Sequence, residues 1–587
     1  MFCCESCGAG LRFDPASQKL VCRSCGASVS VKDFRGREAM RAKEQELSEE
    51  EAAFYQNPEE QAQKNDAYEP IFSDGKAAAS GSSNSETWQA VLMTCPQCGG
   101  QLLTADETAA TFCSFCGASV LLESRVSREK MPKLIIPFQM TKEDCAQAYR
   151  KKLKQAIYIP KDMKSEEQIE RFRGIYMPYW VYSYSKEGEL AVPGKKTTRR
   201  GDYLYIDHFS LRSPVKASYR GISYDASASF SDNLSEAIAP FDYKKKEDFD
   251  EAYLSGFYAD TADVPEYLYA GEAKEAAEEH MARTILQSPV YRAYEVDEKA
   301  AARSMNLQGG KPELAFYPVW FLASRNRAGN RVSYAVVNGQ TGEIAADLPV
   351  DQKKLLIGTL ILAVPIFLIL NLALTMTPTK VLIIVLLLGF ASLFLTNRQM
   401  NLIYCFENRL DDKGYQSKVQ LWDSPGTAER KKKGAPPSKP PISRKGGISI
   451  LLIVLFFVLL TLGSAVGAEG ITMLGYLFFI ILILHQIRPE SRAGKGTKGG
   501  GKAANVSYTA PLKDKMKLLW KSIAGLIAGL VILILDPVSD IYYYAGCVVA
   551  MVFVAWSFWD ILGLHNRLAT RPLPQFEKRG GEEFENQ

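Results

Sequence analysis

The hydrophobic pattern of this 587-residue chain changes abruptly near residue 350. Up to that point short apolar and polar runs alternate with turn residues, a pattern typical of soluble domains. Beyond it, apolar stretches that can cross a hydrocarbon core of about 30 Å predominate. We therefore predict a soluble part and then an all-α transmembrane bundle of about six helices, over Leu355–Met376, Val381–Thr396, Ile448–Val466, Ile471–Ile487, Leu518–Leu535 and Val538–Trp559.

The predicted helices form three hairpins, at 351–397, 448–487 and 518–562. Basic linkers at 398–447 and 488–517 join them, and a tail follows at 563–587. The segment 397–447 holds eleven Lys or Arg residues, whereas the hairpin tips carry Glu469, Asp536 and Asp540. Because basic segments stay on the cytoplasmic side of a membrane, we predict a multi-pass plasma-membrane protein with both termini in the cytoplasm.

The segment 127–350 has the mixed pattern of an α+β middle domain. Helices are predicted over Thr141–Gln155, with the threonine as its N-cap, and over Glu272–Leu286. A hairpin is predicted over Ser333–Leu348. Two strand-like segments share a Pro-x-Trp signature, so the middle domain could itself be duplicated; they are Tyr176–Trp180 and Phe316–Trp320.

Nine of the twelve cysteines lie in the first 116 residues, mostly as C-x2-C pairs. In each of the segments 1–33 and 91–126, two such pairs are separated by fourteen residues. The second set repeats the first with a shift of 91 positions, and CRSCGASV is followed by CSFCGASV. This spacing indicates an internal duplication and metal binding in a reducing compartment.

Two C-x2-C turns supply the four thiolates that Zn²⁺ takes at tetrahedral corners, and a glycine after each pair suits a tight turn. Since such a shell leaves no open position, the metal would be structural rather than catalytic. We favour this interpretation over redox-active or unligated cysteines. The sequence predicts two zinc ribbons with two structural Zn²⁺ ions, held by Cys4, Cys7, Cys22 and Cys25 and by Cys95, Cys98, Cys113 and Cys116.

The charge of the two ribbons argues against nucleic acid, whose phosphates require Lys and Arg. The second ribbon has no basic residue between Met93 and Ser124, and the first is nearly balanced in charge. Between the ribbons, segment 34–90 begins with a charged predicted helix over Phe34–Ala53 and continues as a flexible linker. Contact with protein is therefore the preferred function of the ribbons.

No catalytic motif is found in the sequence, so we expect no enzyme activity. Neither His208 nor His280 lies in a metal-binding or catalytic motif. The segment Gly496–Ala503 is similar to a P-loop, but alanine replaces its Ser or Thr, and a basic linker is the better interpretation. The predicted helices carry almost no ionisable residue away from their ends, which favours an anchor over a transporter or channel.

Several segments of the chain carry a resemblance to a known family: the second cysteine quartet, Ile135–Phe138, Gly174–Trp180, Pro240–Tyr243, Tyr253–Phe257 and Val337–Gly342. They resemble a bacterial family of membrane proteins with a TFIIB-type zinc ribbon, whose members are often labelled primosomal helicase-like. The resemblance implies envelope-stress partners of the phage-shock or SPFH class. This chain has no helicase motor, and its first ribbon and helical tail depart from shorter relatives.

These observations lead to one preferred function and two alternatives. The preferred function is a membrane-anchored, cytoplasm-facing scaffold or adaptor that recruits proteins through its ribbons and middle domain, and the chain could form an oligomer. The first alternative is a membrane-tethered nucleic-acid-binding regulator. The second is a transporter or channel with a regulatory soluble domain.

Overall fold

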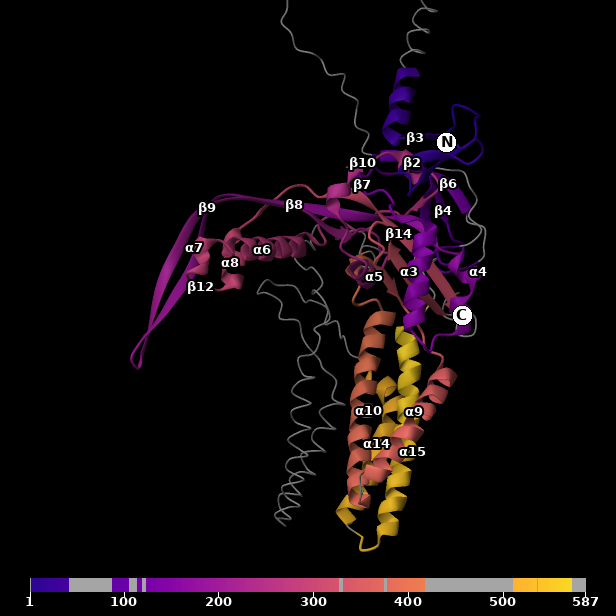
Figure 1. Ribbon diagram of the computed structural model, residues 1–587, viewed down its shortest axis with the longest axis vertical. Coiled ribbons are helices and arrows are strands. Elements are labelled where there is room, and N and C mark those ends of the chain that lie inside the picture. Colours follow the sequence, from indigo (N-terminus) through magenta and orange to yellow (C-terminus); the bar gives the residue numbers. More distant parts are fainter. Residues whose placement is uncertain are drawn as a thin grey trace, which may run out of the picture.

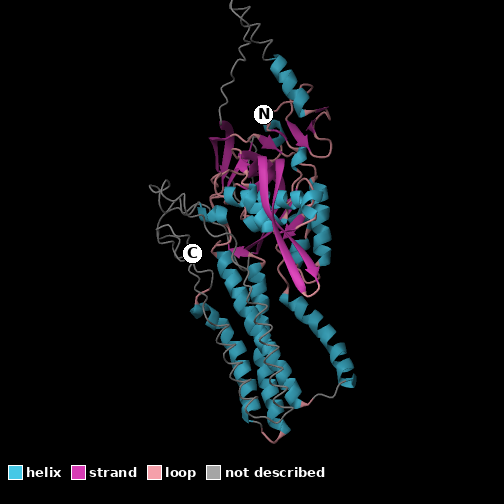
Figure 2. Ribbon diagram, turned by 90° about the vertical axis from the view of Figure 1, so that its left-hand side faces the viewer, coloured by secondary structure: helices cyan, strands magenta, loops and turns pink. Residues whose placement is uncertain are grey.

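The computed structural model describes residues 2–41, 87–104, 113–118, 123–326, 331–373, 377–417, 510–535 and 537–572. A body rich in strands lies at one end of the molecule, and long helices extend from it at the other end (Figures 1 and 2). The coarse prediction of two cysteine clusters, a mixed sheet-rich middle and C-terminal apolar helices is therefore confirmed.

The first ribbon is a small antiparallel sheet with the order β1-β2-β3. Its strands are Leu11–Asp14, Lys19–Cys22 and Ser28–Val29, and residues 31–41 form a helix after them. Of the helix predicted over Phe34–Ala53, residues beyond 41 lie outside the described part. The ribbon is attached to the middle domain, because the Ser255 hydroxyl donates to the Leu11 carbonyl at 2.6 Å.

The second ribbon contributes β4 (Thr87–Thr94), β5 (Gln101–Thr104) and β6 (Glu123–Lys130). Its sheet continues into the middle domain, because β5 also pairs with the two-residue strand β11 (Tyr258–Ala259). The second ribbon and the middle domain therefore share one sheet.

The centre of that sheet is the antiparallel pair of β8 (Arg173–Arg200) and β14 (Glu313–Asn326). The two Pro-x-Trp segments lie opposite each other in this pair. Met177 faces Tyr317. On either side of this pair, Pro178 faces Phe316 and Pro318 faces Tyr176. The pairing is therefore close to a local two-fold arrangement about Met177 and Tyr317.

The strands around this pair repeat the same arrangement. A short strand runs parallel to each central strand: β7 (Leu134–Ile135) beside β14, and β11 beside β8. A longer strand then pairs with the C-terminal part of each: β15 (Arg331–Asn338) with β14, and β9 (Tyr203–Asp225) with β8. A helix follows each short strand, α3 (Lys142–Gln155) after β7 and α6 (Ala270–Leu286) after β11.

Local sequence signals explain several of these elements. Thr141 caps α3 with a complete capping box, in which Asp144 bonds back to the Thr141 backbone. β15 and β16 (Ile344–Ala346) form the predicted hairpin, whose turn includes Gly342 at a φ of 80°. The remaining short elements, in which η denotes a 3-10 helix, are η1 Lys161–Lys164, α4 Glu166–Ile169, α5 Asp232–Ala237, η2 Tyr243–Lys245, β10 Glu247–Asp248, η3 Glu251–Leu254, α7 Pro289–Arg292, β12 Glu295–Val296, α8 Glu298–Met305 and β13 Gln308–Gly309.

The two signature tryptophans belong to the core. Trp180 and Trp320 are 4% and 6% exposed, and each indole N–H donates to a backbone carbonyl, of Val264 at 2.8 Å and of Met140 at 3.0 Å. An amphipathic ring that is buried with its N–H satisfied stabilises a core. These residues therefore hold the domain together rather than forming a binding platform.

Four helices in the described part of the chain are long and apolar enough to cross a membrane. They are α9 (Gln352–Ala373), α10 (Pro378–Glu407), α14 (Leu512–Leu535) and α15 (Asp540–Leu568). The stretches at 448–466 and 471–487 lie outside the described residues. Helix α10 continues well past the apolar stretch that ends at Thr396. Hydropathy shows where the side chains stop being apolar, whereas the helix ends where its backbone hydrogen bonds end, at Glu407.

Helices α10, α14 and α15 pack against one another, and α9 stands apart from them (Figure 2). One serine from each packed helix meets the others in the interior: the Ser557 hydroxyl lies 2.6 Å from that of Ser522, and Ser392 contacts both. Nearer the soluble body, Lys521 pairs with Asp560 at 2.6 Å. Hydropathy alone did not indicate this ion pair between two apolar helices.

Candidate metal centres and the membrane junction

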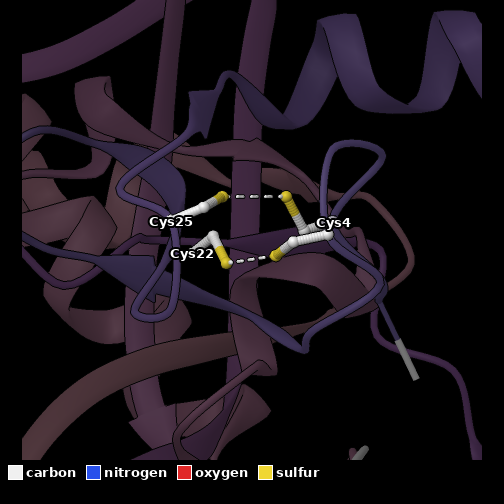
Figure 3. Close-up of side chains that lie close together, drawn as sticks. Cys4, Cys22 and Cys25 are labelled. Carbon is white, nitrogen blue, oxygen red and sulfur yellow. Dashed lines mark hydrogen bonds between the residues drawn. The ribbon is translucent and has the colours of Figure 1, made fainter.

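The first cysteine quartet brings together two turns from opposite ends of the first ribbon. The sulphur of Cys4 lies 3.6 Å from that of Cys25, and the sulphur of Cys7 lies 3.5 Å from that of Cys22. Figure 3 shows Cys4 and Cys25 pointing toward each other across the gap between the turns. All four sulphurs lie within 4.8 Å of one another.

The second quartet has nearly the same geometry. Its sulphurs are 3.9 Å apart between Cys95 and Cys116 and 3.7 Å apart between Cys98 and Cys113. Four thiolates at about 2.3 Å from a tetrahedral ion are about 3.8 Å from each other. Both quartets therefore fit a four-coordinate metal ion, and all eight sequence-predicted ligands take part.

In the first quartet, the backbone of each turn favours the thiolate form of its first cysteine. The pKa of Cys22 is lowered to about 6, first by a hydrogen bond from the Cys25 backbone. In the same way, the Ser6 backbone lowers the pKa of Cys4. The glycines that follow the four pairs all have φ between 66° and 76°, a conformation that favours glycine.

The two quartets differ in burial. All four cysteines of the second quartet are buried, whereas Cys7 and Cys25 of the first are exposed. The second quartet is enclosed by the middle domain, where the Tyr334 hydroxyl donates to the Phe115 carbonyl at 2.8 Å. A metal ion in the second ribbon would therefore support the body, whereas the turns of the first ribbon face outward.

Ion pairs fix the first ribbon and its helix on the body. Arg35 contacts Asp250 at 2.8 Å, and Lys32 contacts Glu247 at the same distance. Within the ribbon, Arg37 and Arg41 both pair with Glu5. Two of the cations of the segment 31–41 are therefore neutralised by a carboxylate of the ribbon itself.

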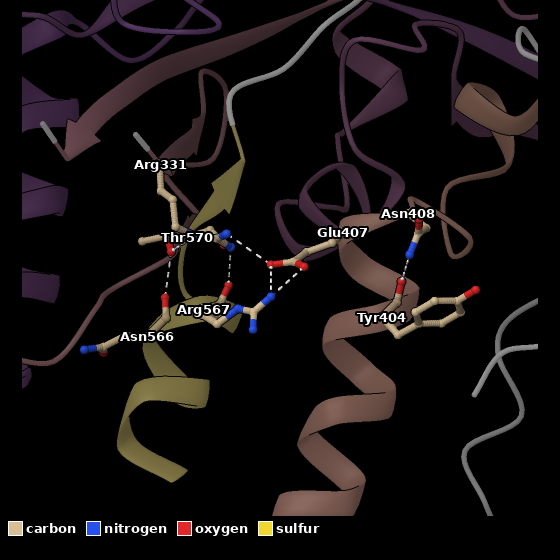
Figure 4. Close-up of polar contacts among 7 residues, drawn as sticks. All are labelled: Arg331, Tyr404, Glu407, Asn408, Asn566, Arg567 and Thr570. Atoms are coloured by element: carbon tan, nitrogen blue, oxygen red, sulfur yellow. Dashed lines mark hydrogen bonds and ion pairs between the residues drawn. The ribbon is translucent and has the colours of Figure 1, made fainter. Parts of the chain in front are cut away.

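A second group of contacts fastens the body to the long apolar helices α10 and α15 (Figure 4). Arg331 in β15 bonds Glu407 at the end of α10, at 3.0 Å. It also donates to the carbonyls of Arg567 and Thr570, at 2.9 Å and 2.7 Å, where α15 ends. Arg567 closes the network by contacting Glu407 at 2.8 Å. We call these four residues the junction.

The chain after α15 also joins the sheet of the body. The two residues Arg571–Pro572 form β17, which pairs with β15 beside Arg331. Close by, the side-chain amide of Asn566 donates to the Val350 carbonyl and its oxygen accepts from the Val350 N–H, both at 2.8 Å. The segment that leads into α9 and the segment that leaves α15 are therefore held together.

Buried carboxylates lie on the body side of α10. Asp225 and Asp412 are 4% and 3% exposed, and each keeps one oxygen without a hydrogen-bond partner among the residues that the structure describes. Asp232 accepts from the Tyr269 hydroxyl and from the Lys413 backbone. Burial raises the pKa of Asp412 to about 8, with a further contribution from nearby Asp232, and burial also raises the pKa of Asp225 and Asp232.

The chain is 26% identical over 245 residues to an uncharacterized protein, YdjG, of Bacillus subtilis, covering 40% of this chain and 69% of the relative. No family model matches, and no solved structure matches.

Sequence patterns indicated the cysteine quartets but not the junction or the buried carboxylates. The junction residues are widely separated along the chain, and none belongs to a motif. The only available signal was the polar end of α10, where Glu407 and Arg409 follow an apolar helix.

Proposed function

We propose that this chain is a multi-pass plasma-membrane scaffold that recruits protein partners to the cytoplasmic face through its ribbons and middle domain. The carrying observation is that the first ribbon, the second ribbon and the middle domain pack as one body, which the junction fastens to α10 and α15. Such a body can hold a partner at a fixed place beside the bilayer.

The metal in both quartets is Zn²⁺ in this proposal. Four cysteine thiolates with tetrahedral spacing suit Zn²⁺, and a closed shell of this kind stabilises a fold without catalysing a reaction. Cys4, Cys7, Cys22 and Cys25 would hold one ion, and Cys95, Cys98, Cys113 and Cys116 the other.

Protein rather than nucleic acid is the proposed partner. The second ribbon has no basic residue between Met93 and Ser124 and is buried against the middle domain. In the first ribbon, Arg37 and Arg41 are paired with Glu5. Since affinity for nucleic acid depends on cations available to phosphates, these faces suit a protein surface better.

The first ribbon is the proposed contact face. Its outward turns carry Cys7 and Cys25, and the helix at 31–41 extends beside them (Figure 1). Membrane proteins of the phage-shock and SPFH classes, which the family resemblance implies, are the first candidates. The orientation with both termini in the cytoplasm follows from the basic linkers.

The test is recovery of partners from a detergent extract of cells that contain the full chain, with and without nuclease. Cys22→Ser with Cys25→Ser removes ligands of the first quartet, and Cys3→Ser is the matched control, because Cys3 is exposed and outside that quartet. The proposal expects nuclease-resistant protein partners that the double variant loses and the control keeps. Recovery that requires nucleic acid would favour the regulator instead.

A further inference from the structure

The hairpin of β8 and β9 extends far beyond the sheet as an arm (Figure 1). Along its length it is packed against α6, α7 and β12. Phe209 contacts Tyr294 at a ring distance of 5.1 Å, and the Ser213 hydroxyl lies 2.5 Å from that of Tyr291. The last strand along the arm, β12, pairs with Gly194 and Lys195. Beyond that point no described element covers either face of the hairpin.

The uncovered tip presents apolar side chains to solvent. Tyr203 is 73% exposed, Leu204 61%, Tyr205 52% and Ile206 49%. In a strand, successive side chains point to opposite faces, so both faces of the tip carry one aromatic or aliphatic residue after another. Four consecutive exposed residues of this kind at the end of a rigid hairpin indicate a contact surface.

Basic residues lie directly opposite these apolar ones. Arg200 pairs with Tyr203 across the hairpin and Arg199 with Leu204, while Lys195 and Lys196 stand nearer the base. The Arg200 guanidinium also lies 5.8 Å from the centre of the Tyr205 ring. Over the same segment the acids are Asp202 and Asp207, so the bases are in excess.

The arm leaves the body sideways and inclines toward the side of the body on which the apolar helices lie. Both views show its tip level with the beginning of α9, to the side of the helices (Figures 1 and 2). Helix α9 carries Lys353 and Lys354 in its first turn and becomes apolar at Leu355, which places the membrane surface near this level. The tip therefore lies where a bilayer around the helices would present its headgroups.

We propose that the tip of the β8–β9 arm inserts into the anionic surface of the membrane that the helices cross. Tyrosines suit the headgroup level, because the ring is apolar and the hydroxyl stays wet. Lys and Arg beside them attract anionic lipid. A protein partner would contact one face of the hairpin, so the other face would not need apolar and basic side chains. A layer of lipid headgroups surrounds the tip and contacts both faces.

This inference rests on the proposed membrane placement, and one experiment separates the two. The full chain is placed in nanodiscs of phosphatidylcholine, with or without phosphatidylglycerol. A benzophenone amino acid replaces Tyr205 at the tip, Ile361 on α9, or Met40 at the far end of the body. Ile361 and Met40 are 69% and 68% exposed. Adducts formed on illumination are identified by mass spectrometry.

We expect lipid adducts at positions 205 and 361 and none at 40, with the adduct at 205 increasing when phosphatidylglycerol is present. Arg199→Glu with Arg200→Glu should lower the adduct at 205 by roughly tenfold. The same charge change at Lys19 and Arg23, exposed on the first ribbon, should leave it unchanged.

The outcomes are distinct. A lipid adduct at 361 without one at 205 would overturn the arm inference and leave the membrane placement standing. Absence of lipid adducts at both positions would overturn the membrane placement itself. An adduct at 205 to a second copy of the chain, or equal lipid adducts at 205 and 40, would also reject the arm as a membrane contact.

Discussion

Arg331 in the sheet of the body and Glu407 at the end of α10 lie 3.0 Å apart, joined by a charge-assisted hydrogen bond. Both side chains are largely buried, at 21% and 23% exposure. The same guanidinium also holds the end of α15 through the carbonyls of Arg567 and Thr570. One side chain thus connects the body to two of the long apolar helices, and movement of either helix would displace Arg331 and with it β15.

Replacing Arg331 by alanine should loosen this connection. The variant loses its bonds to Glu407, to the Thr570 hydroxyl and to two carbonyls, and among the described residues leaves Arg567 as the partner of Glu407, which should destabilise the junction by about 3 kcal/mol. Hydrogen exchange of the full chain should show faster exchange at residues 566–572. Arg303→Ala, at an exposed position of α8, is the control and should leave this segment unchanged. Unchanged exchange in Arg331→Ala would contradict the assigned role of the junction.

The pattern of the sequence was sufficient for features that depend on local spacing. The two cysteine quartets follow from C-x2-C pairs at equal separation, and the start of α3 follows from Thr141 with Asp144 three residues later. The β15–β16 hairpin was equally local. In each case the residues that determine the structure are close together in the chain.

Other features depend on pairings between distant segments. β11 and β17 are two residues long, too short for any periodic signal, yet they connect the second ribbon and the end of α15 to the main sheet. The ion pair of Lys521 and Asp560 could not be predicted from the sequence either, because each residue lies within or at the end of an apolar run.

The two quartets should respond differently to loss of one ligand. Cys25→Ser should reduce zinc from about two ions per chain to about one and leave the body folded, because Cys25 is exposed on an outward turn of the first ribbon. Cys98→Ser should reduce the yield of folded protein, because the second quartet is buried among core residues of the middle domain. Metal analysis of the purified chain measures the first effect and size-exclusion chromatography the second. Iron in the quartets, or two zinc ions retained by Cys25→Ser, would contradict this assignment.

Stability should depend on pH through Asp412. Its pKa is raised to about 8 by burial, so between about pH 4 and 8 the folded chain keeps a proton that the unfolded chain has lost, and stability falls as pH rises. Asp412→Asn removes this loss, and its stabilising effect should be larger near pH 8 than near pH 5 by roughly 4 kcal/mol, because each pH unit between the two pKa values corresponds to about 1.4 kcal/mol. Thermal unfolding at the two pH values measures it, with Asp162→Asn, at an exposed position, as the control. Equal effects of Asp412→Asn at both values would show that Asp412 does not titrate as described.

Lys521 and Asp560 should stabilise the folded chain only when both charges are present. Their side chains are 11% and 17% exposed, and Lys521 also lies 4.3 Å from the centre of the Trp556 ring. Lys521→Met leaves Asp560 without its partner and should cost about 3–5 kcal/mol, whereas Lys521→Met with Asp560→Met should recover most of the loss. Thermal unfolding in detergent compares the variants. A double variant no more stable than the single one would mean that the two charges do not act together.

The central claim, a membrane-anchored scaffold that binds protein through its metal-loaded first ribbon, is tested most directly by crosslinking in living cells. A benzophenone amino acid replaces Ser24, an exposed residue between Cys22 and Cys25. The account predicts discrete protein adducts in the membrane fraction that resist nuclease, persist with Cys3→Ser and disappear with Cys22→Ser. Adducts that are sensitive to nuclease, or protein adducts that survive loss of the Cys22 ligand, would contradict it.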